Sequence, residues 1–287
     1  MADGPDRIET RELAYFAAVA EELHFGRAAA RLGIAQPPLS RAIQRLERRL
    51  GVLLLERTPR GVTLTGPGEV LLREARRALE AVDAAVRRTR RAGAGTERIV
   101  LVMKPGGDGG LLPAILDAYE AAEPDPVPVE VMMCGIGERG RALRDGSADA
   151  GLLHTPYEDL TGFDTEELVT EGQVLIVPRG HRLAGRGHVT LADLDGERLF
   201  DRERDGMPEA GHLMQMIALG RVAMLAPESV ADHLRRDLVC VPVPDAPAVT
   251  VVIAWPERTR SPAVAALVRA AGAAAAGGAA AGRRVRG

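Results

Sequence analysis

The chain has 287 residues, of which 46% are hydrophobic and only 3% aromatic, so any core must be aliphatic and alanine-rich. Residues 1–92 hold 17 arginines against 12 acidic residues, whereas the remainder holds 20 basic and 28 acidic residues. This asymmetry indicates a basic domain that contacts phosphates and an acidic part with another task. The two cysteines are far apart and predict no disulfide framework, and the N-terminus lacks an apolar secretory segment. We therefore expect a cytoplasmic protein with no membrane span, metal or cofactor.

Three helices are predicted near the N-terminus. Thr10 can cap a helix over residues 11–23, and an alanine-rich helix over residues 26–32 ends at Gly33. A third helix runs over residues 36–50, and its prolines suit a first turn. In it Leu39, Ile43, Leu46 and Leu50 form one apolar stripe at helical period.

The polar face of the third helix is rich in arginine and glutamine, as helices that enter the major groove of DNA are. An ordinary amphipathic pair with a solvated face is the alternative. The helices are followed by a predicted hairpin, with strands at residues 52–57 and 62–65, which makes a winged helix-turn-helix. The DNA-contacting residues expected on the helices and the wing are Arg27, Gln36, Pro37, Pro38, Ser40, Arg41, Gln44, Arg45, Arg57 and Arg60.

A long helix without breakers is predicted from residue 69 to residue 91. Its apolar residues recur at intervals of three and four residues and form one narrow stripe along the helix. A stripe of this kind favours a helix that dimerises. The alternative is a connector packed on its own domain. The stripe consists of Leu72, Ala75, Leu79, Val82 and Val86.

The run from Glu12 to Gly68 (ELAYFAAVAEELHFGRAAARLGIAQPPLSRAIQRLERRLGVLLLERTPRGVTLTGPG) resembles the DNA-binding domain of LysR-type transcriptional regulators without a gap. The resemblance implies a winged helix-turn-helix at residues 1–67, an antiparallel dimerisation helix at 68–95 and a small-molecule effector domain at 96–271. It also implies a homodimer or homotetramer that binds imperfect inverted repeats in double-stranded DNA near promoters, with RNA polymerase as a further candidate partner.

Residues 96–271 also have a pattern of their own. Strands alternate with helices, which predicts an α/β fold with a parallel, doubly wound sheet. The order suggests two lobes, as in periplasmic binding proteins: lobe I at about 96–168 and 248–271, and lobe II at about 169–247. The resemblance implies that lobe II is shortened between Phe200 and Met214, where the family usually has a fuller strand and helix. The alanine- and glycine-rich residues 272–287 suggest a disordered tail.

Ligands in such folds bind at strand ends, in the crevice between lobes. Lys104, the only lysine, precedes a glycine-rich loop and favours an anionic effector, although an exposed lysine in a mobile loop is the alternative. His154 either contacts the effector or is a structural histidine. Cys134 either contacts the effector or is a packed thiol. The family usually has serine or threonine hydroxyls at the two loops that here carry Lys104 and Cys134. The candidate set is Lys104, Gly106, Gly107, Cys134, Gly135, His154, Phe200 and Asp201.

Other functions fit the sequence less well. Ser229, Asp232 and His233 lie within five residues of one another, but no Gly-x-Ser-x-Gly elbow or nucleotide-binding phosphate loop is present, so we expect no enzyme. A solute-binding protein would need no DNA-binding domain. A regulator whose degenerate effector domain binds no ligand is the remaining alternative.

Overall fold

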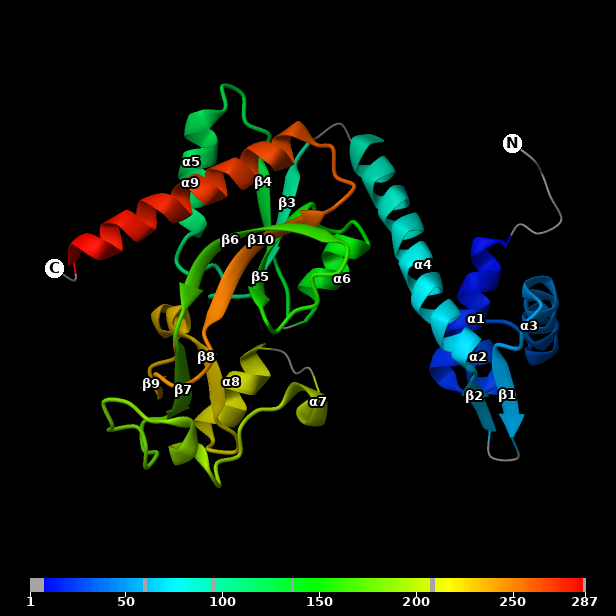
Figure 1. Cartoon of the computed structure of the whole chain (residues 1–287), viewed down its shortest axis with the longest axis horizontal. Coiled ribbons are helices and arrows are strands. Elements are labelled where there is room, and N and C mark those ends of the chain that lie inside the picture. Colours follow the sequence, from blue (N-terminus) through cyan, green and yellow to red (C-terminus); the bar gives the residue numbers. More distant parts are fainter. Residues whose placement is uncertain (1–7, 59–60, 94–96, 136, 207–209, 286–287) are drawn as a thin grey trace. The chain divides into compact units, whose positions relative to one another are not determined.

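A computed structural model describes residues 8–58, 61–93, 97–135, 137–206 and 210–285. The chain divides into two compact units, residues 1–88 and 89–287, and each is described by itself (Figure 1). No helix in the described ranges is long and apolar enough to cross a membrane.

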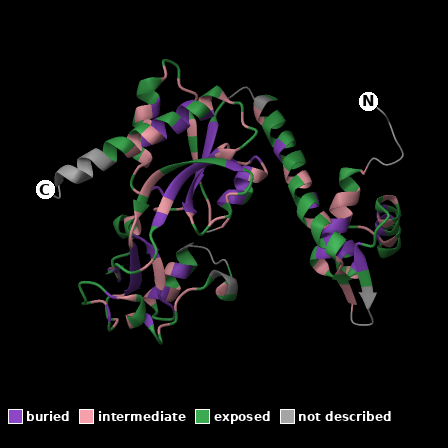
Figure 2. Ribbon diagram, viewed as in Figure 1, coloured by how far each residue is buried: buried purple, intermediate pink, exposed green. Residues whose placement is uncertain are grey.

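The first unit contains three short helices, α1 (Thr10–Glu22), α2 (Phe25–Leu32) and α3 (Gln36–Leu50). His24 caps α2, because its Nδ1 accepts the backbone N–H groups of Gly26 at 3.0 Å and Arg27 at 3.2 Å. Gly33 ends α2 with φ of +67°, a conformation that glycine adopts without strain. The three helices enclose one hydrophobic core (purple in Figure 2), which includes Phe16, Val19, Leu39, Ile43 and Leu46.

A two-stranded hairpin follows, with β1 (Leu55–Thr58) antiparallel to β2 (Gly61–Leu64). The hairpin confirms the predicted wing, but its first strand starts three residues later than the expected Val52. Glu47 explains the difference, because its carboxylate accepts the N–H groups of Leu54 and Leu55 at 2.9 and 3.2 Å and holds the chain at the end of α3. The long helix α4 (Gly66–Gly93) then begins close to the predicted position.

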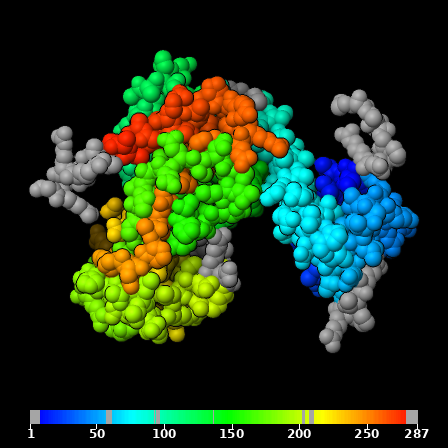
Figure 3. Space-filling model, in the orientation of Figure 1, coloured from blue at the N-terminus to red at the C-terminus, as the bar shows by residue number. Residues whose placement is uncertain are grey.

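The second unit contains a five-stranded sheet of order β4-β3-β5-β10-β6. Helices α5 and α9 share a hydrophobic core with this sheet, and a second core on the sheet includes Ala142 and Leu143 of α6. Figure 3 shows α9, orange to red, at the surface. The bounds of these elements are β3 (Ile99–Met103), α5 (Leu112–Ala122), β4 (Val129–Met133), α6 (Arg139–Arg144), β5 (Ala150–Thr155), β6 (Phe163–Glu171), β10 (Val249–Pro256) and α9 (Pro262–Val285).

A smaller sheet of order β8-β7-β9 has its own cores and is entered through Gly172. Two 3₁₀ helices, η1 and η2, and two α-helices belong to this part. Their bounds are β7 (Gln173–Pro178), η1 (Leu191–Leu194), α7 (Arg202–Asp205), α8 (Ala210–Ala218), β8 (Met224–Pro227), η2 (Glu228–His233) and β9 (Leu238–Val243).

The predicted parallel sheet is found only in part. Strands β4, β3 and β5 are parallel, but β10 is antiparallel to both β5 and β6, and the smaller sheet is antiparallel throughout. The connectivity gives the reason: β6 leads out to the smaller sheet and β10 returns from it, so the two neighbours run in opposite directions.

Helix α9 continues to Val285 and so extends into residues 272–287, for which the sequence suggested a disordered tail. Alanine is the strongest helix former, and the run of alanines extends the helix beyond its buried first turns. Gly272 lies against the Glu166 carboxylate, where a Cβ would collide, so this glycine permits close packing rather than ending the helix. Residues 286–287 lie outside the described part of the chain.

Candidate functional site

Helix α3 presents an open polar face. Leu39, Ile43 and Leu46 are fully buried, which turns the opposite side of the helix outward. On that side Arg41, Gln44 and Arg45 are exposed, and their side chains make no hydrogen bond or ion pair with any described residue. Guanidinium and amide groups without protein partners are free to contact base edges and phosphates.

Other arginines of the first unit are paired within the protein. Arg49 donates to Glu12 at 2.9 Å, and Arg31 and Arg76 both pair with Glu21 at 2.9 Å. Burial raises the pKa of Glu21, but the hydrogen bonds and charges of Arg31 and Arg76 outweigh it and leave that pKa below its ordinary value. The contrast with Arg41 and Arg45 separates arginines that stabilise the domain from those available to a partner.

The remaining predicted DNA contacts differ in what the structure shows of them. Gln36, Pro37 and Pro38 are exposed at the start of α3, and Ser40 is half-buried. Arg27 is exposed but pairs with Glu22 at 3.2 Å. Arg57 lies on β1 opposite Val62, but its side chain, like the whole of Arg60, is outside the described residues. The DNA-contacting role of all these residues stays a prediction.

The apolar stripe of α4 divides into two parts. Leu72 packs against the core of the first unit, as the connector alternative requires, and Ala75 is buried. Val82 and Val86 are 41% and 43% exposed, and Leu79 is half-buried. The latter part of the stripe is therefore the part that remains available to a second chain.

In the second unit, a buried ion pair joins the first residue of α6 to the segment that follows β5. Neither partner is among the effector-binding residues expected from the sequence. Arg139 Nη2 is 2.7 Å from Glu158 Oε2, and the two side chains are only 2% and 5% exposed. Arg139 also donates to the Leu152 carbonyl oxygen at 2.7 Å, and the Glu158 carboxylate accepts the backbone N–H of His154 at 2.9 Å. The pair fixes the end of β5 where His154 lies.

His154 is a neutral imidazole whose tautomer is determined by Arg139. Its Nδ1 lies 3.0 Å from Arg139 Nη1, and a guanidinium can only donate, so Nδ1 accepts and Nε2 carries the hydrogen. Burial, followed by the charges of Lys104 and Arg139, lowers the pKa of His154 to about 2. Its buried Nε2 has no partner among the described residues.

Lys104 follows β3 at the same end of the sheet. Burial lowers the pKa of its ammonium to about 8, with a further lowering by Arg139 and opposing effects of Glu158 and Glu171. The side chain lies against Gly107, where a Cβ would overlap it. A Cβ at Gly106, whose φ is +62°, would come within 2.9 Å of His233 Cδ2. The glycine loop that follows Lys104 thus lies against His233 of η2.

Glu171, the last residue of β6, completes this group. Its Oε2 accepts the backbone N–H of Ser229 at 2.7 Å, which joins the end of the larger sheet to η2. Sequence reasoning missed Arg139, Glu158 and Glu171 as site residues. Glu158 could have been found from its position four residues after His154, beyond the same strand, whereas the others had no local signal.

The other candidate residues are distributed around this group. Burial raises the pKa of the Cys134 thiol, which is also influenced by Arg139 and Glu158. Gly135 donates its N–H to Glu138 at 2.8 Å. Phe200 is partly buried against the core of the smaller sheet, and Asp201 accepts the N–H of Arg204 at 3.1 Å at the start of α7. A ligand contact by these residues stays a prediction.

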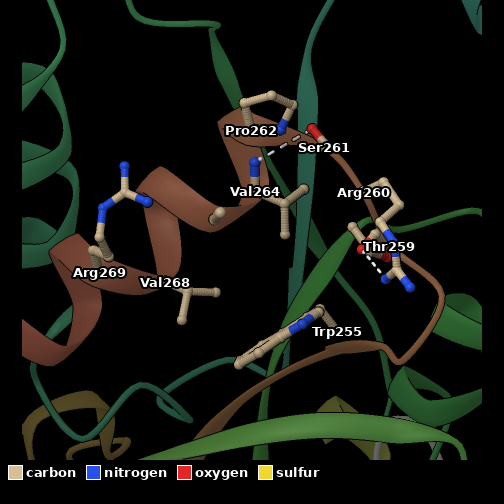
Figure 4. Close-up of a pocket in the computed structure, with 9 residues that line it drawn as sticks. Trp255, Thr259, Arg260, Ser261, Pro262, Val264, Val268 and Arg269 are labelled. Carbon is tan, nitrogen blue, oxygen red and sulfur yellow. Dashed lines mark hydrogen bonds between the residues drawn. The ribbon is translucent and has the colours of Figure 1, made fainter.

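A separate cavity of about 330 Å³ lies between the end of β10 and the start of α9 (Figure 4). Trp255, Val264 and Val268 form much of its wall, and Arg260 and Arg269 also line it. Arg260 donates to the Thr259 carbonyl oxygen at 3.1 Å, and Arg269 lies 3.6 Å from Glu123. None of the candidate effector residues lines this cavity.

The two units define a class of protein: a winged helix-turn-helix joined through a long helix to a two-sheet α/β domain with a polar site at its strand ends. Residues 10–69 match the family model for bacterial regulatory helix-turn-helix proteins of the LysR family, and residues 90–210 match the LysR substrate binding domain.

Individual relatives agree with the two family matches. The chain is 35% identical over 202 residues to the regulator AlsR of Bacillus subtilis. The aligned residues cover 70% of this chain and 66% of AlsR, so the chain spans just under two thirds of the length of AlsR. It is 31% identical to the regulator BudR of Raoultella terrigena, across 88% of this chain and 97% of BudR. The crystal structure of the LysR family regulator CbnR superposes with a TM-score of 0.57 at 25% identity and covers 93% and 99% of the two chains. The chain belongs to the LysR family of transcriptional regulators, which are not enzymes.

Proposed function

We propose that this protein regulates transcription by binding specific double-stranded DNA through α3, in the cytoplasm. The observation that carries the proposal is the open face of α3, on which Arg41, Gln44 and Arg45 have no partner among the described residues. Paired arginines elsewhere in the unit show that free ones are not simply the result of a high arginine content. Imperfect inverted repeats near promoters are the proposed sites, and a homodimer or homotetramer is the proposed binding form, with RNA polymerase as a candidate partner.

The exposed part of the α4 stripe supports the oligomeric form. Val82 and Val86, one helical turn apart, place apolar surface on an exposed part of the helix. Two such helices side by side would bury that surface and present two copies of α3 to two half-sites, as the symmetry of an inverted repeat requires.

A small-molecule effector is the proposed signal, and its anionic group binds at Lys104. Lys104 is a half-buried lysine whose ammonium has no hydrogen-bond or ion-pair partner among the described residues, and it lies beside a neutral histidine whose buried Nε2–H is also unpartnered. A negatively charged group would satisfy both donors. The effector would change the angle between the two lobes and thereby the spacing and bend of the bound DNA.

A shortened second lobe remains part of this proposal. Between the bridge at Leu199 and the start of α8 at Ala210, the described chain forms only the four-residue helix α7. If this lobe no longer encloses a ligand, the protein would act as a ligand-independent regulator.

Selection of binding sequences from a random DNA pool with the purified full-length protein tests the first part of the proposal. We expect enrichment of an imperfect inverted repeat and protection of both half-sites from nuclease digestion. Enrichment of no sequence over random DNA would overturn it. For the second part, Lys104→Ala should bind the selected DNA as the unchanged protein does but lose the response of a reporter gene to the effector. An unchanged response would exclude Lys104 from the effector site.

A further inference from the structure

The polar groups around Lys104 include more than donors. His154 Nε2–H and the Lys104 ammonium are donors without partners in the described chain, and both lie at the carboxyl ends of neighbouring strands, β5 and β3. A buried donor without a partner costs folding free energy, so the buried His154 Nε2–H beside the half-buried, unpartnered Lys104 ammonium indicates a place for a ligand oxygen. Taken alone, they would suit any carboxylate.

Two carboxylate oxygens in the same group are also without partners. Glu158 Oε1 and Glu171 Oε1 are buried and accept no hydrogen bond from a described residue, although the second oxygen of each carboxylate is satisfied. Of the two, Glu171 is the one without a cationic partner, since its Oε2 accepts only the backbone N–H of Ser229. An acceptor of this kind requires a donor from the ligand, preferably a charged one.

These donors and acceptors belong to one site. The pKa of Lys104 responds to the charges of Glu158 and Glu171, and that of His154 responds to Lys104. Gly109, in the loop after Lys104, approaches Glu171 so closely that a Cβ there would lie 3.1 Å from its Oε1. The Ser229 hydroxyl is also buried and has no partner among the described residues. It belongs to the same group because the backbone N–H of Ser229 donates to Glu171.

The charges in this group balance. The two cations, Lys104 and Arg139, face the two anions, Glu158 and Glu171, while His154 is neutral. A simple anion would leave Glu171 without a donor and would add a negative charge next to two carboxylates. A ligand that carries both an anionic and a cationic group matches the donors, the acceptors and the balance of charge.

We propose that the effector is a zwitterion of the amino-acid class, with its carboxylate at Lys104 and His154 and its protonated amine at Glu171. This inference rests on the proposed effector function and narrows the class of ligand for that site. Ser229 Oγ is placed to serve as a further partner of either group. The proposal excludes a simple carboxylic acid as the preferred ligand.

The test is a thermal-shift screen of the full-length protein against the standard L-amino acids, followed by isothermal titration calorimetry. Each amino acid that binds is compared with three analogues of the same side chain: the α-hydroxy acid, the acid without the amine, and the amino acid amide. We expect the amino acid to bind about tenfold or more tightly than each analogue, because each lacks one charge-assisted contact. Equal or tighter binding of the acid without the amine would overturn the proposal, as would the absence of binding by every amino acid.

Variants separate the two ends of the ligand. Glu171→Gln keeps an oxygen to accept the Ser229 N–H but removes the charge, so it should weaken amino-acid binding about tenfold and leave the acid without the amine nearly unaffected. Glu167→Gln, an exposed position on the same strand, is the matched control and should change neither. If Glu171→Gln weakens both ligands equally, Glu171 does not bind the amine and the proposal fails. Binding of the selected DNA, measured on the same preparations, shows whether the proposed regulatory function holds independently of this result.

Discussion

Arg139 and Glu158 form a buried ion pair, with 2.7 Å between Nη2 and Oε2 and almost no solvent exposure of either side chain. The pair joins α6 to the segment after β5, and it holds both atoms that position His154: the Arg139 Nη1 at Nδ1 and the Glu158 carboxylate at the backbone N–H. The candidate effector site is therefore built on a fixed frame rather than on mobile surface groups.

Glu158→Ala should destabilise the second unit by about 3–5 kcal/mol, because removal of one partner leaves the Arg139 charge buried without its carboxylate. Fluorescence of Trp255, the single tryptophan of the chain, during urea unfolding would measure this loss. Asp159→Ala is the matched control, since this neighbouring carboxylate is 70% exposed in its pair with Arg144 and should cost less than about 1 kcal/mol. Equal effects of the two variants would contradict a structural role for the buried pair.

Arg41→Ala should weaken binding to the selected DNA sequence by about 1–3 kcal/mol, with a smaller effect on random DNA, because a base contact is lost. Fluorescence anisotropy at several salt concentrations would separate the two kinds of binding. Arg73→Ala, an exposed arginine of α4 that pairs with Glu74, serves as the control and should change the affinity little. An equal loss on both DNAs would show that Arg41 contacts only phosphate.

The double substitution Leu79→Glu and Val82→Glu should convert the oligomer to monomers, because two negative charges would enter an apolar contact between chains. Light scattering of the purified protein measures the mass directly. Arg77→Glu also introduces a negative charge but on the opposite side of the helix by helical period, and it should leave the oligomer intact. A dimer that survives the double substitution would place the interface elsewhere.

Lys104→Met should stabilise the second unit at pH 7, by on the order of 1–3 kcal/mol, because a partly desolvated ammonium is replaced by an apolar side chain of similar length. The pKa of Lys104 is about 8 in the folded protein against an ordinary value of 10.5. Between these values the unfolded chain binds the extra proton, so the unchanged protein gains stability as the pH rises. The advantage of Lys104→Met should therefore shrink from pH 8 to pH 10.5, as urea unfolding followed by Trp255 fluorescence would show. An advantage that is constant with pH would mean that the ammonium is well solvated.

The local elements of the first unit follow directly from the sequence. The stripe of Leu39, Ile43 and Leu46 has the period of one helix, and Gly33 supplies the left-handed residue that ends the helix before it. Such features depend on neighbours within a few residues, so they can be predicted without knowing the rest of the fold. The open face of α3 follows from the same stripe, because burial of one side of a helix determines which side faces outward.

The candidate effector site was predictable only in part. Lys104 and His154 were expected, because a residue at the end of a predicted strand is at an edge where ligands bind. Arg139, Glu158 and Glu171 come from different segments, and only the packing of α6, β5 and β6 brings their charges together. The direction of β10 was likewise decided by tertiary contacts, since the sequence gives no sign of which strand will lie beside it. Periodicity thus determined the helices and the open face of α3, whereas long-range packing determined which donors and acceptors meet at Lys104.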